Sequence, residues 1–168
     1  ADELLESAEN KDAALTNDNG ITHSWAYVCL LVDLVNRGIA GHSAGRTRDA
    51  GLVLAAFATL DFPLTEQVFH TDRGSEFDNT RIDELLDVFD IKRSLSRKGR
   101  PYDNAVVEST NRLLKKELAT ELAYRNHYAT LEQLGMINDY VWWSDNQRLH
   151  STPGCRSPKE FTEQGLVL

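Results

Sequence analysis

The sequence predicts an α/β fold in which helices cover the faces of a sheet. The first observation is a nearly continuous apolar run over residues 25–34, which is typical of a strand covered on both faces. The second is the order of the patterns up to residue 95, which alternate between strand and helix and favour a sheet flanked by helices. The third is size, because 168 residues, of which 41% are hydrophobic, suffice for one domain with its own core.

The first residues predict a different kind of segment. Residues 1–15 combine Ala and Leu with acidic residues and predict a helix with a thin apolar stripe. Residues 17–20, Asn-Asp-Asn-Gly, predict a turn because these residue types tolerate positive φ. After the apolar run, residues 36–38 turn the chain, and residues 39–44 return as a neighbouring antiparallel strand.

The remaining elements follow from hydrophobic spacing and from capping residues. Thr47 can cap a helix that runs to Thr59, with apolar residues on one face at helical spacing. The sequence then predicts a short strand, a helix, a strand and two long helices, over residues 68–70, 78–89, 91–95, 103–125 and 131–146. This order places helices between strands, as an α/β sheet requires.

Composition excludes several classes of protein. No apolar run approaches the roughly 20 residues that a membrane-spanning helix needs, and the first residues are acidic rather than basic and then apolar. Cys29 and Cys155 lack the spacing of metal ligands, so a reduced setting is the default. We therefore expect a cytoplasmic protein with neither a membrane partner nor a small-molecule substrate.

Charge is distributed unevenly along the chain. The net charge of −8 argues at first against a nucleic-acid partner, since phosphate binding draws on Lys and Arg. However, residues 1–18 hold six acidic residues and one basic residue, whereas residues 92–100 hold five basic residues and no acidic one. The basic stretch is either a solvated surface loop or a contact for nucleic-acid phosphates. The candidate DNA-binding residues in and after it are Arg97, Lys98, Arg100, Arg112 and Lys115.

Two acidic residues have the positions that a two-metal site requires. Asp72 follows the strand of residues 68–70, at a strand end where sites form in α/β sheets, and Glu108 lies early in a long helix. Carboxylate oxygens suit Mg²⁺ or Mn²⁺, and two such ions can stabilise the attacking and leaving oxygens of a phosphodiester displacement. Two alternatives remain open: Asp72 in an ordinary turn, and Glu108 paired with Arg112 on the helix surface.

Four stretches together carry a resemblance to a known family. They are residues 31–37 (Leu-Val-Asp-Leu-Val-Asn-Arg), 70–77 (His-Thr-Asp-Arg-Gly-Ser-Glu-Phe), 102–109 (Tyr-Asp-Asn-Ala-Val-Val-Glu-Ser), and 146–151 with 157–161. In this order they resemble the catalytic core of bacterial insertion-sequence transposases of the "IS-three" family, which belong to the retroviral-integrase-like Asp-Asp-Glu superfamily. The resemblance extends from about Trp25 to Phe161.

The resemblance implies an RNase H-like fold with a mixed five-stranded sheet flanked by helices. It also implies an Asp-Asp-Glu triad that binds two divalent ions, usually Mg²⁺, and that cleaves and joins DNA strands at transposon ends. Asp72 matches the second acid of the triad and Glu108 the third. By the same resemblance we expect transposon ends and target DNA as partners, and self-association of the chain.

The first acid of the triad departs from the family pattern. The family places it about ten residues before the residue that matches Trp25, where this chain has Leu15. Asp12 serves if the intervening hairpin is longer and is a tentative metal ligand, whereas Asp18 requires a shorter hairpin. Asp33 lies on the following strand, where the resemblance makes it a companion of the site rather than a member of the triad.

This departure leaves more than one function open. We expect residues 1–18 to form an acidic segment that matches the family poorly, and residues 19–168 to form a single integrase-like domain. The first hypothesis is a metal-dependent enzyme, the catalytic domain of a DNA transposase. The alternative is a truncated, catalytically inactive transposase fragment that keeps the fold, and with it DNA binding or self-association. A related nuclease acting on another nucleic acid fits the four stretches less well.

Overall fold

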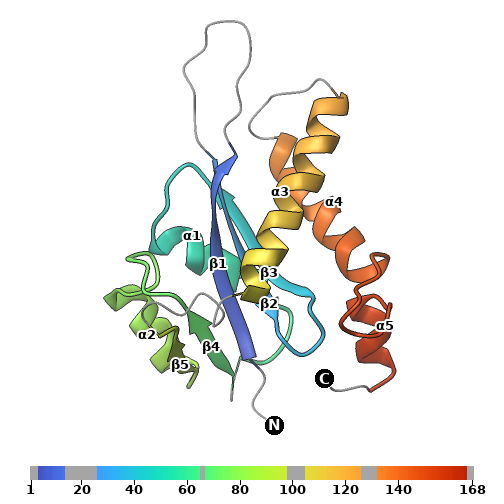
Figure 1. Cartoon of the computed structure of the whole chain (residues 1–168). Coiled ribbons are helices and arrows are strands. Elements are labelled where there is room, and N and C mark those ends of the chain that lie inside the picture. Colours follow the sequence, from blue (N-terminus) through green and yellow to red (C-terminus); the bar gives the residue numbers. More distant parts are fainter. Residues whose placement is uncertain (1–3, 14–25, 65–66, 98–104, 126–131, 166–168) are drawn as a thin grey trace, which may run out of the picture.

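Five strands form one sheet in the part of the chain that the structure describes (Figure 1). The structure is a computed structural model that describes residues 4–13, 26–64, 67–97, 105–125 and 132–165. The strands are β1 (Leu4–Ala13), β2 (Ala26–Asp33), β3 (Ile39–Gly45), β4 (Val68–Thr71) and β5 (Lys92–Leu95). They lie in the order β3-β2-β1-β4-β5, antiparallel among β1, β2 and β3 and parallel among β1, β4 and β5. The predicted mixed five-stranded sheet is confirmed.

The first strand corrects the sequence-based expectation of a helix. Residues 1–15 were expected to be helical, but Leu4–Ala13 is the middle strand of the sheet. It pairs with β2 from Leu5 opposite Asp33 to Ala13 opposite Ala26, and with β4 from Leu4 beside Val68 to Ser7 beside Thr71. Local preference for a helix is a weak prior, and hydrogen bonding on both edges of the segment overrides it here. Residues 4–13 are therefore part of the same sheet as the elements after residue 19.

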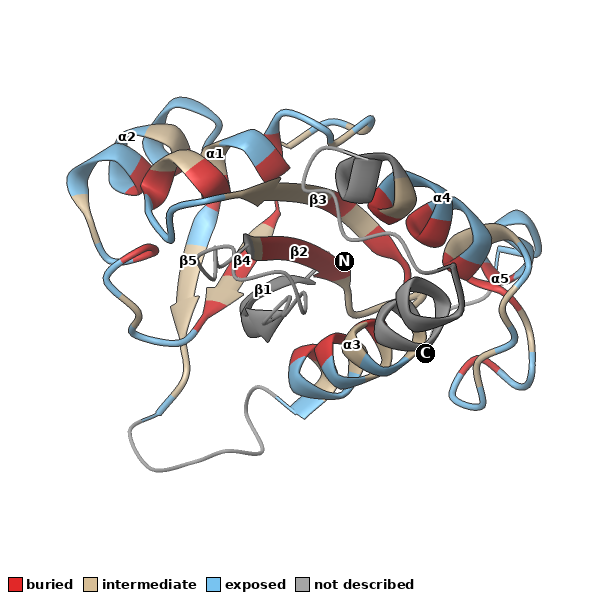
Figure 2. Ribbon diagram, turned by 90° about the horizontal axis from the view of Figure 1, so that it is seen from above, coloured by how far each residue is buried: buried red, intermediate tan, exposed pale blue. Residues whose placement is uncertain are grey.

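Helices cover both faces of the sheet. They are α1 (Ala50–Phe57), α2 (Thr80–Val88), α3 (Ala105–Arg125), α4 (Glu132–Asn146) and α5 (Pro158–Glu163). Figure 2 shows α1 and α2 on one side of the sheet and α3 on the other, with α4 and α5 beside the β3 edge. No helix in the described ranges is long and apolar enough to cross a lipid bilayer.

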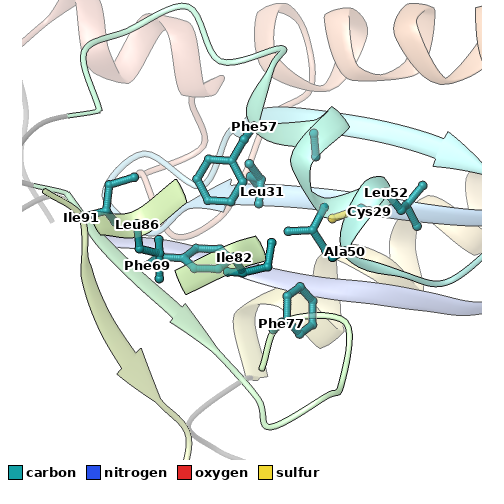
Figure 3. Close-up of a cluster of buried hydrophobic side chains, with 12 residues drawn as sticks. Cys29, Leu31, Ala50, Leu52, Phe57, Phe69, Phe77, Ile82, Leu86 and Ile91 are labelled. Carbon is teal, nitrogen blue, oxygen red and sulfur yellow. The ribbon is translucent and has the colours of Figure 1, made fainter. Parts of the chain in front are cut away.

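The β2 strand has the two-sided burial that its apolar run predicts. Cys29 and Leu31 belong to the core cluster under α1 and α2, whereas Val28, Leu30 and Val32 belong to the cluster under α3 and α4. Figure 3 shows the first cluster, in which Leu31 and Cys29 lie among side chains from α1, α2 and β4. Because alternate residues of a strand point to opposite faces, this one strand supplies the centre of both clusters.

Capping residues define where the two short helices begin. Asp49, rather than the expected Thr47, caps α1 and accepts a hydrogen bond from the Leu52 N–H. Asn79 caps α2 and accepts from the Ile82 N–H, as the predicted start of that helix requires. The difference at α1 is small, because Asp and Thr both make good caps and the structure uses the one nearer the apolar stripe.

Candidate active site

Asp72 lies immediately after the last residue of β4. Phe69 and Thr71 of that strand are fully buried, so the backbone leading to Asp72 is held by the core. The Asp72 side chain is exposed, and its Oδ1 accepts a hydrogen bond of 2.9 Å from the Gly74 N–H. This is a turn of the ordinary kind, yet it leaves the carboxylate in solvent where a cation can reach it.

The loop after Asp72 contains a buried carboxylate. The Glu76 side chain is only 4% exposed, and the Arg48 Nη2 lies 3.8 Å from Glu76 Oε2. A Cβ at position 74 would collide with the Glu76 carboxylate, so Gly74 is needed for this close approach. Phe77 is also buried and anchors the end of the loop in the core cluster under α1 and α2.

His70 connects β4 to the segment that leads into the basic stretch. Its Nδ1 lies 2.8 Å from the Ser94 Oγ, and its Nε2 lies 3.0 Å from the Ser96 Oγ. Both ring nitrogens are thus engaged by hydroxyl groups of β5 and of the residue after it. His70 is therefore a hydrogen-bonded histidine near the end of β4.

Glu108 lies in the first turn of α3, on a side of the helix that does not face the core. Val107 and Leu114 are fully buried, whereas Glu108 is exposed. At 100° per residue, Arg112 and Lys115 follow Glu108 along one stripe, with Arg112 exposed and Lys115 half-buried. One face of α3 therefore packs on the sheet, and the next presents a carboxylate beside two cations.

The two predicted acids are carried by elements that both contact β1. β4 pairs with β1, and α3 packs against it. Continuing the register of Ser7 beside Thr71 by one residue places Ala8 beside Asp72. Asp12 is four residues further along β1, about 13 Å at 3.3 Å per residue. Two other acids of β1 lie closer in register, Glu6 beside His70 and Glu9 next to Ala8.

Nothing in the described side chains completes a metal site. Those side chains, which do not include the ones of β1, contain no group of three or more His, Cys, Asp or Glu residues placed to hold a metal ion. Asp18 and the predicted turn at residues 17–20 lie outside the described residues. The sequence does not single out Glu6 and Glu9, because its local pattern predicts a helix there; the strand pairing is what places both acids near Asp72 in register.

The basic residues differ in burial and in position. Arg93 is held structurally, since its guanidinium lies 2.7 Å from Asp83 and donates to the Phe77 carbonyl. Arg97 is exposed just beyond β5, close in sequence to Ser96 and thus to the end of β4. The predicted DNA-binding residues Lys98 and Arg100 lie outside the described residues. The described cations that could meet phosphate near Glu108 are those of Arg97, Arg112 and Lys115.

Comparison with models of known families identifies the family of this chain. The family model described as an integrase core domain matches residues 12–101, more than half of the chain. The chain belongs to the integrase core domain family. A second integrase core domain model matches residues 89–158, so the two together extend through α4.

Relatives of this integrase core domain include named transposases. The chain is 32% identical over 139 residues to the transposase for insertion sequence element IS904 of Lactococcus lactis, covering 80% of this chain and 54% of that protein. It is 30% identical over 151 residues to transposase InsF for insertion sequence IS3fB of Escherichia coli, covering 85% and 50%. The chain thus spans about half the length of the curated relatives that it matches. The predicted resemblance to insertion-sequence transposases is confirmed.

Solved structures confirm the fold of this integrase core domain. The catalytic core domain of BIV integrase superimposes with a TM-score of 0.68 at 19% identity, covering 98% of this chain and 97% of that one. A simian T-cell lymphotropic virus intasome, in complex with a PP2A regulatory subunit, gives 0.73 at 15% identity, covering 95% and 54%. The predicted RNase H-like fold is therefore confirmed.

Asp33, the expected companion of the site, lies in a different place in this integrase core domain. It lines a cavity of about 570 Å³ between β3, α4 and α5, together with Asp145 and Thr162 and without Asp72 or Glu108. Burial raises the pKa of Asp145 to about 7, a hydrogen bond from the Ile39 N–H opposes that rise, and the nearby Asp33 adds to it. The Asp33–Asp145 pair is thus a local feature of this cavity.

A network of polar side chains that the sequence does not predict joins α3 to α4. Glu117 accepts a hydrogen bond of 2.7 Å from the Tyr140 hydroxyl and one of 2.9 Å from Arg148, whose guanidinium also lies over the Trp143 ring. Burial raises the pKa of Tyr140, and its hydrogen bond to Glu117 raises it further. These contacts fix α3, and with it Glu108, against the rest of the integrase core domain. No spacing in the sequence indicates this network.

Proposed function

We propose that this chain is the catalytic core of an insertion-sequence transposase, which cuts DNA at transposon ends and joins it to target DNA. One observation carries the proposal: in a chain of the integrase core domain family, exposed carboxylates stand at the end of β4 and on the first turn of α3, both beside β1. The names of the relatives support the same activity, since they are transposases for insertion sequences.

Asp72 and Glu108 are the proposed metal ligands and thus the catalytic residues. Their donor atoms fit Mg²⁺ or Mn²⁺, which prefer carboxylate oxygens as ligands. Two such ions, when bound, would neutralise charge on the attacking and leaving oxygens of the phosphodiester. A related core, that of HTLV-2 integrase, was solved in complex with magnesium, which supports this choice of ion.

A carboxylate of β1 is the proposed third ligand. Asp12 is the residue that the family spacing suggested, but Glu6 and Glu9 lie nearer to Asp72 in the register of β1 with β4. Single substitutions Glu6→Gln, Glu9→Gln and Asp12→Asn would separate them. We expect the true ligand to be the one whose loss abolishes metal-dependent activity while the other two variants keep it.

DNA is the proposed partner, and the basic stripe is its proposed contact. Arg112 and Lys115 follow Glu108 along one stripe of α3. Arg97, Lys98 and Arg100 precede that helix in the sequence. Contacts to phosphates would hold the strand beside the carboxylates and make binding depend on salt. We propose that this takes place in the cytoplasm, where bacterial DNA lies.

Self-association is also proposed, with α4 as its surface. Trp142 and Trp143 are 57% and 39% exposed on that helix, and Leu149 just beyond it is 64% exposed. Large exposed aromatic groups are common in interfaces between protein chains. The intasome among the structural neighbours agrees with an assembly of several chains.

The test is a cleavage and strand-transfer assay on DNA that carries the ends of the element encoding the chain. We expect activity that requires Mg²⁺ or Mn²⁺ and falls by at least about 100-fold in Asp72→Asn and Glu108→Gln, because each removes a charged ligand. Glu84→Gln is the matched control, since Glu84 is an exposed acid of α2, and it should retain full activity. Activity that survives both ligand substitutions would exclude this site. DNA binding without any cleavage by the unaltered chain would support the inactive fragment instead.

A further inference from the structure

A second polar cavity lies on the far side of α3 from Glu108. It has a volume of about 230 Å³ and lies between α3, α4, the turn from β2 to β3 and the loop after α4. Its lining includes three nitrogen-bearing side chains and several hydroxyl groups, among them Arg37, Arg148, His150, Ser109, Ser144 and Ser151. Within α3 its lining residues are centred roughly 150° around the helix from the stripe of Glu108, at 100° per residue. The cavity is therefore separate from the proposed metal site.

Arg37 brings a cation to this cavity from a constrained turn. The turn is closed by a hydrogen bond of 2.9 Å from the Asp33 N–H to the Gly38 carbonyl and one of 2.8 Å from the Arg37 N–H to the Asp33 carbonyl. Arg37 has φ of 68°, a left-handed conformation that a residue with a long side chain rarely adopts. Its Nε is buried and makes no hydrogen bond in the described part of the protein. A buried guanidinium nitrogen without an acceptor points to an acceptor supplied from outside.

His150 has a buried nitrogen that can accept a hydrogen bond, whereas the Arg37 Nε can only donate one. Its Nε2 is buried and has no hydrogen-bond partner among the described residues, so its bond to the Ser144 backbone is made by Nδ1. Burial lowers the pKa of His150, the charge of Arg148 lowers it further, and the Ser144 bond and Glu117 act against this. In the neutral ring, Nδ1 donates to Ser144 and Nε2 is therefore an acceptor.

The remaining charges of the cavity leave one cation in excess. Glu117 is occupied on both oxygens by Tyr140 and Arg148, so it compensates the charge of Arg148. The Arg37 Nε has no hydrogen-bond partner in the described structure. The Ser109 and Thr110 hydroxyls donate to the Val106 carbonyl, and the Tyr140 hydroxyl donates to Glu117. The cavity thus offers the Arg37 cation, the hydroxyl groups of Ser144, Ser151 and Thr152, and one acceptor nitrogen.

We infer that this cavity binds a phosphate group, held by the Arg37 guanidinium and the surrounding hydroxyl groups, with His150 Nε2 against one phosphate oxygen. Guanidinium groups recognise phosphate with strong charge-assisted hydrogen bonds. The phosphate comes from one of two sources, free inorganic phosphate or the backbone of DNA. Hydrogen phosphate carries a P–OH that donates to neutral His150, whereas a DNA diester has no such proton and requires His150 to take one up.

The test is a calorimetric titration with inorganic phosphate, at constant ionic strength and without divalent metal. Arg37→Gly is the informative variant, because glycine keeps the left-handed turn and removes the guanidinium. Arg46→Gly is its matched control, since Arg46 is an exposed arginine beyond β3 that does not line the cavity. We expect saturable binding that weakens at least about tenfold in Arg37→Gly and is unchanged in Arg46→Gly. Equal affinity in all three chains, or no saturable binding, would mean a cavity filled only by water and would overturn the inference.

A second pair of titrations identifies the source of the phosphate. Duplex DNA without terminal phosphates is added as a competitor at pH 6 and pH 8. If the DNA backbone is the source, the duplex displaces inorganic phosphate, and more strongly at pH 6, where His150 is more easily protonated. If free phosphate is the source, the duplex displaces nothing at either pH, and Arg37→Gly still weakens phosphate binding. Because no metal is present, neither result bears on the metal site of the proposed transposase.

Discussion

Asp145 makes the stability of this domain depend on pH in an unusual direction. Burial raises the pKa of its carboxyl from 3.8 to about 7 in the folded chain, and we expect an ordinary value in the unfolded chain. The folded state therefore holds a proton that the unfolded state has released between these two values. Stability from this group is fully present below about pH 4 and is lost as the pH rises through 7. A shift of about three pKa units corresponds to at most about 4 kcal/mol, and local relaxation would reduce it.

The substitution Asp145→Asn tests this reasoning. An asparagine keeps the acceptor for the Ile39 N–H and resembles the protonated acid, which has no charge to bury. We expect Asp145→Asn to be more stable than the unaltered chain by at most about 1 kcal/mol at pH 5 and by about 1–3 kcal/mol at pH 8, measured by urea unfolding. Asp139→Asn, at an exposed position of the same helix, is the control and should show no such pH dependence. A stability difference that is the same at pH 5 and pH 8 would refute the assignment.

Three further substitutions probe the elements that position the site. Gly74→Ala should destabilise the chain by about 1–3 kcal/mol in urea unfolding, because the new Cβ meets the Glu76 carboxylate. Adding Glu76→Ala should recover part of that loss. A loss that Glu76→Ala does not reduce would place the strain elsewhere. His70→Phe removes the contacts to two hydroxyl groups and should lower the free energy of unfolding by about 1–2 kcal/mol. It should also lower the protection of the β5 amides from hydrogen exchange. Protection equal to that of the unaltered chain would contradict this. Leu114→Ala, at a fully buried position of α3, should cost about 2–5 kcal/mol in the same unfolding assay, whereas the exposed Arg112→Ala should cost far less.

The elements that the sequence predicts well are those whose own residues define them. The β2 run is apolar on both faces because both faces are buried, and the helical spacing after residue 104 reflects the face of α3 that packs on the sheet. Asp72 and Glu108 could be proposed because Asp72 directly follows such an element and Glu108 lies in the first turn of another.

The elements that the sequence misses depend on partners distant in the chain. Leu4–Ala13 has no strand pattern of its own, and its conformation comes from pairing with β2 and β4. In the same way, the contact of Glu117 with Arg148 and the burial of Asp145 arise only when α3, α4 and β3 come together. Local pattern cannot reveal an environment that is assembled from separate segments.

The central place of β1 has a consequence for how the domain folds. β2 and β3 pair with each other, and β4 and β5 pair with each other, but β1 alone joins these two halves. Its pairing with β4 links residues 4–7 to residues 68–71, a long-range parallel contact that forms slowly because a large loop must close first. A chain shortened by its first 13 residues would leave β2 and β4 with facing, unpaired edges, and such edges invite pairing with other chains. We therefore expect loss of this one strand to cause aggregation rather than a slightly smaller stable core.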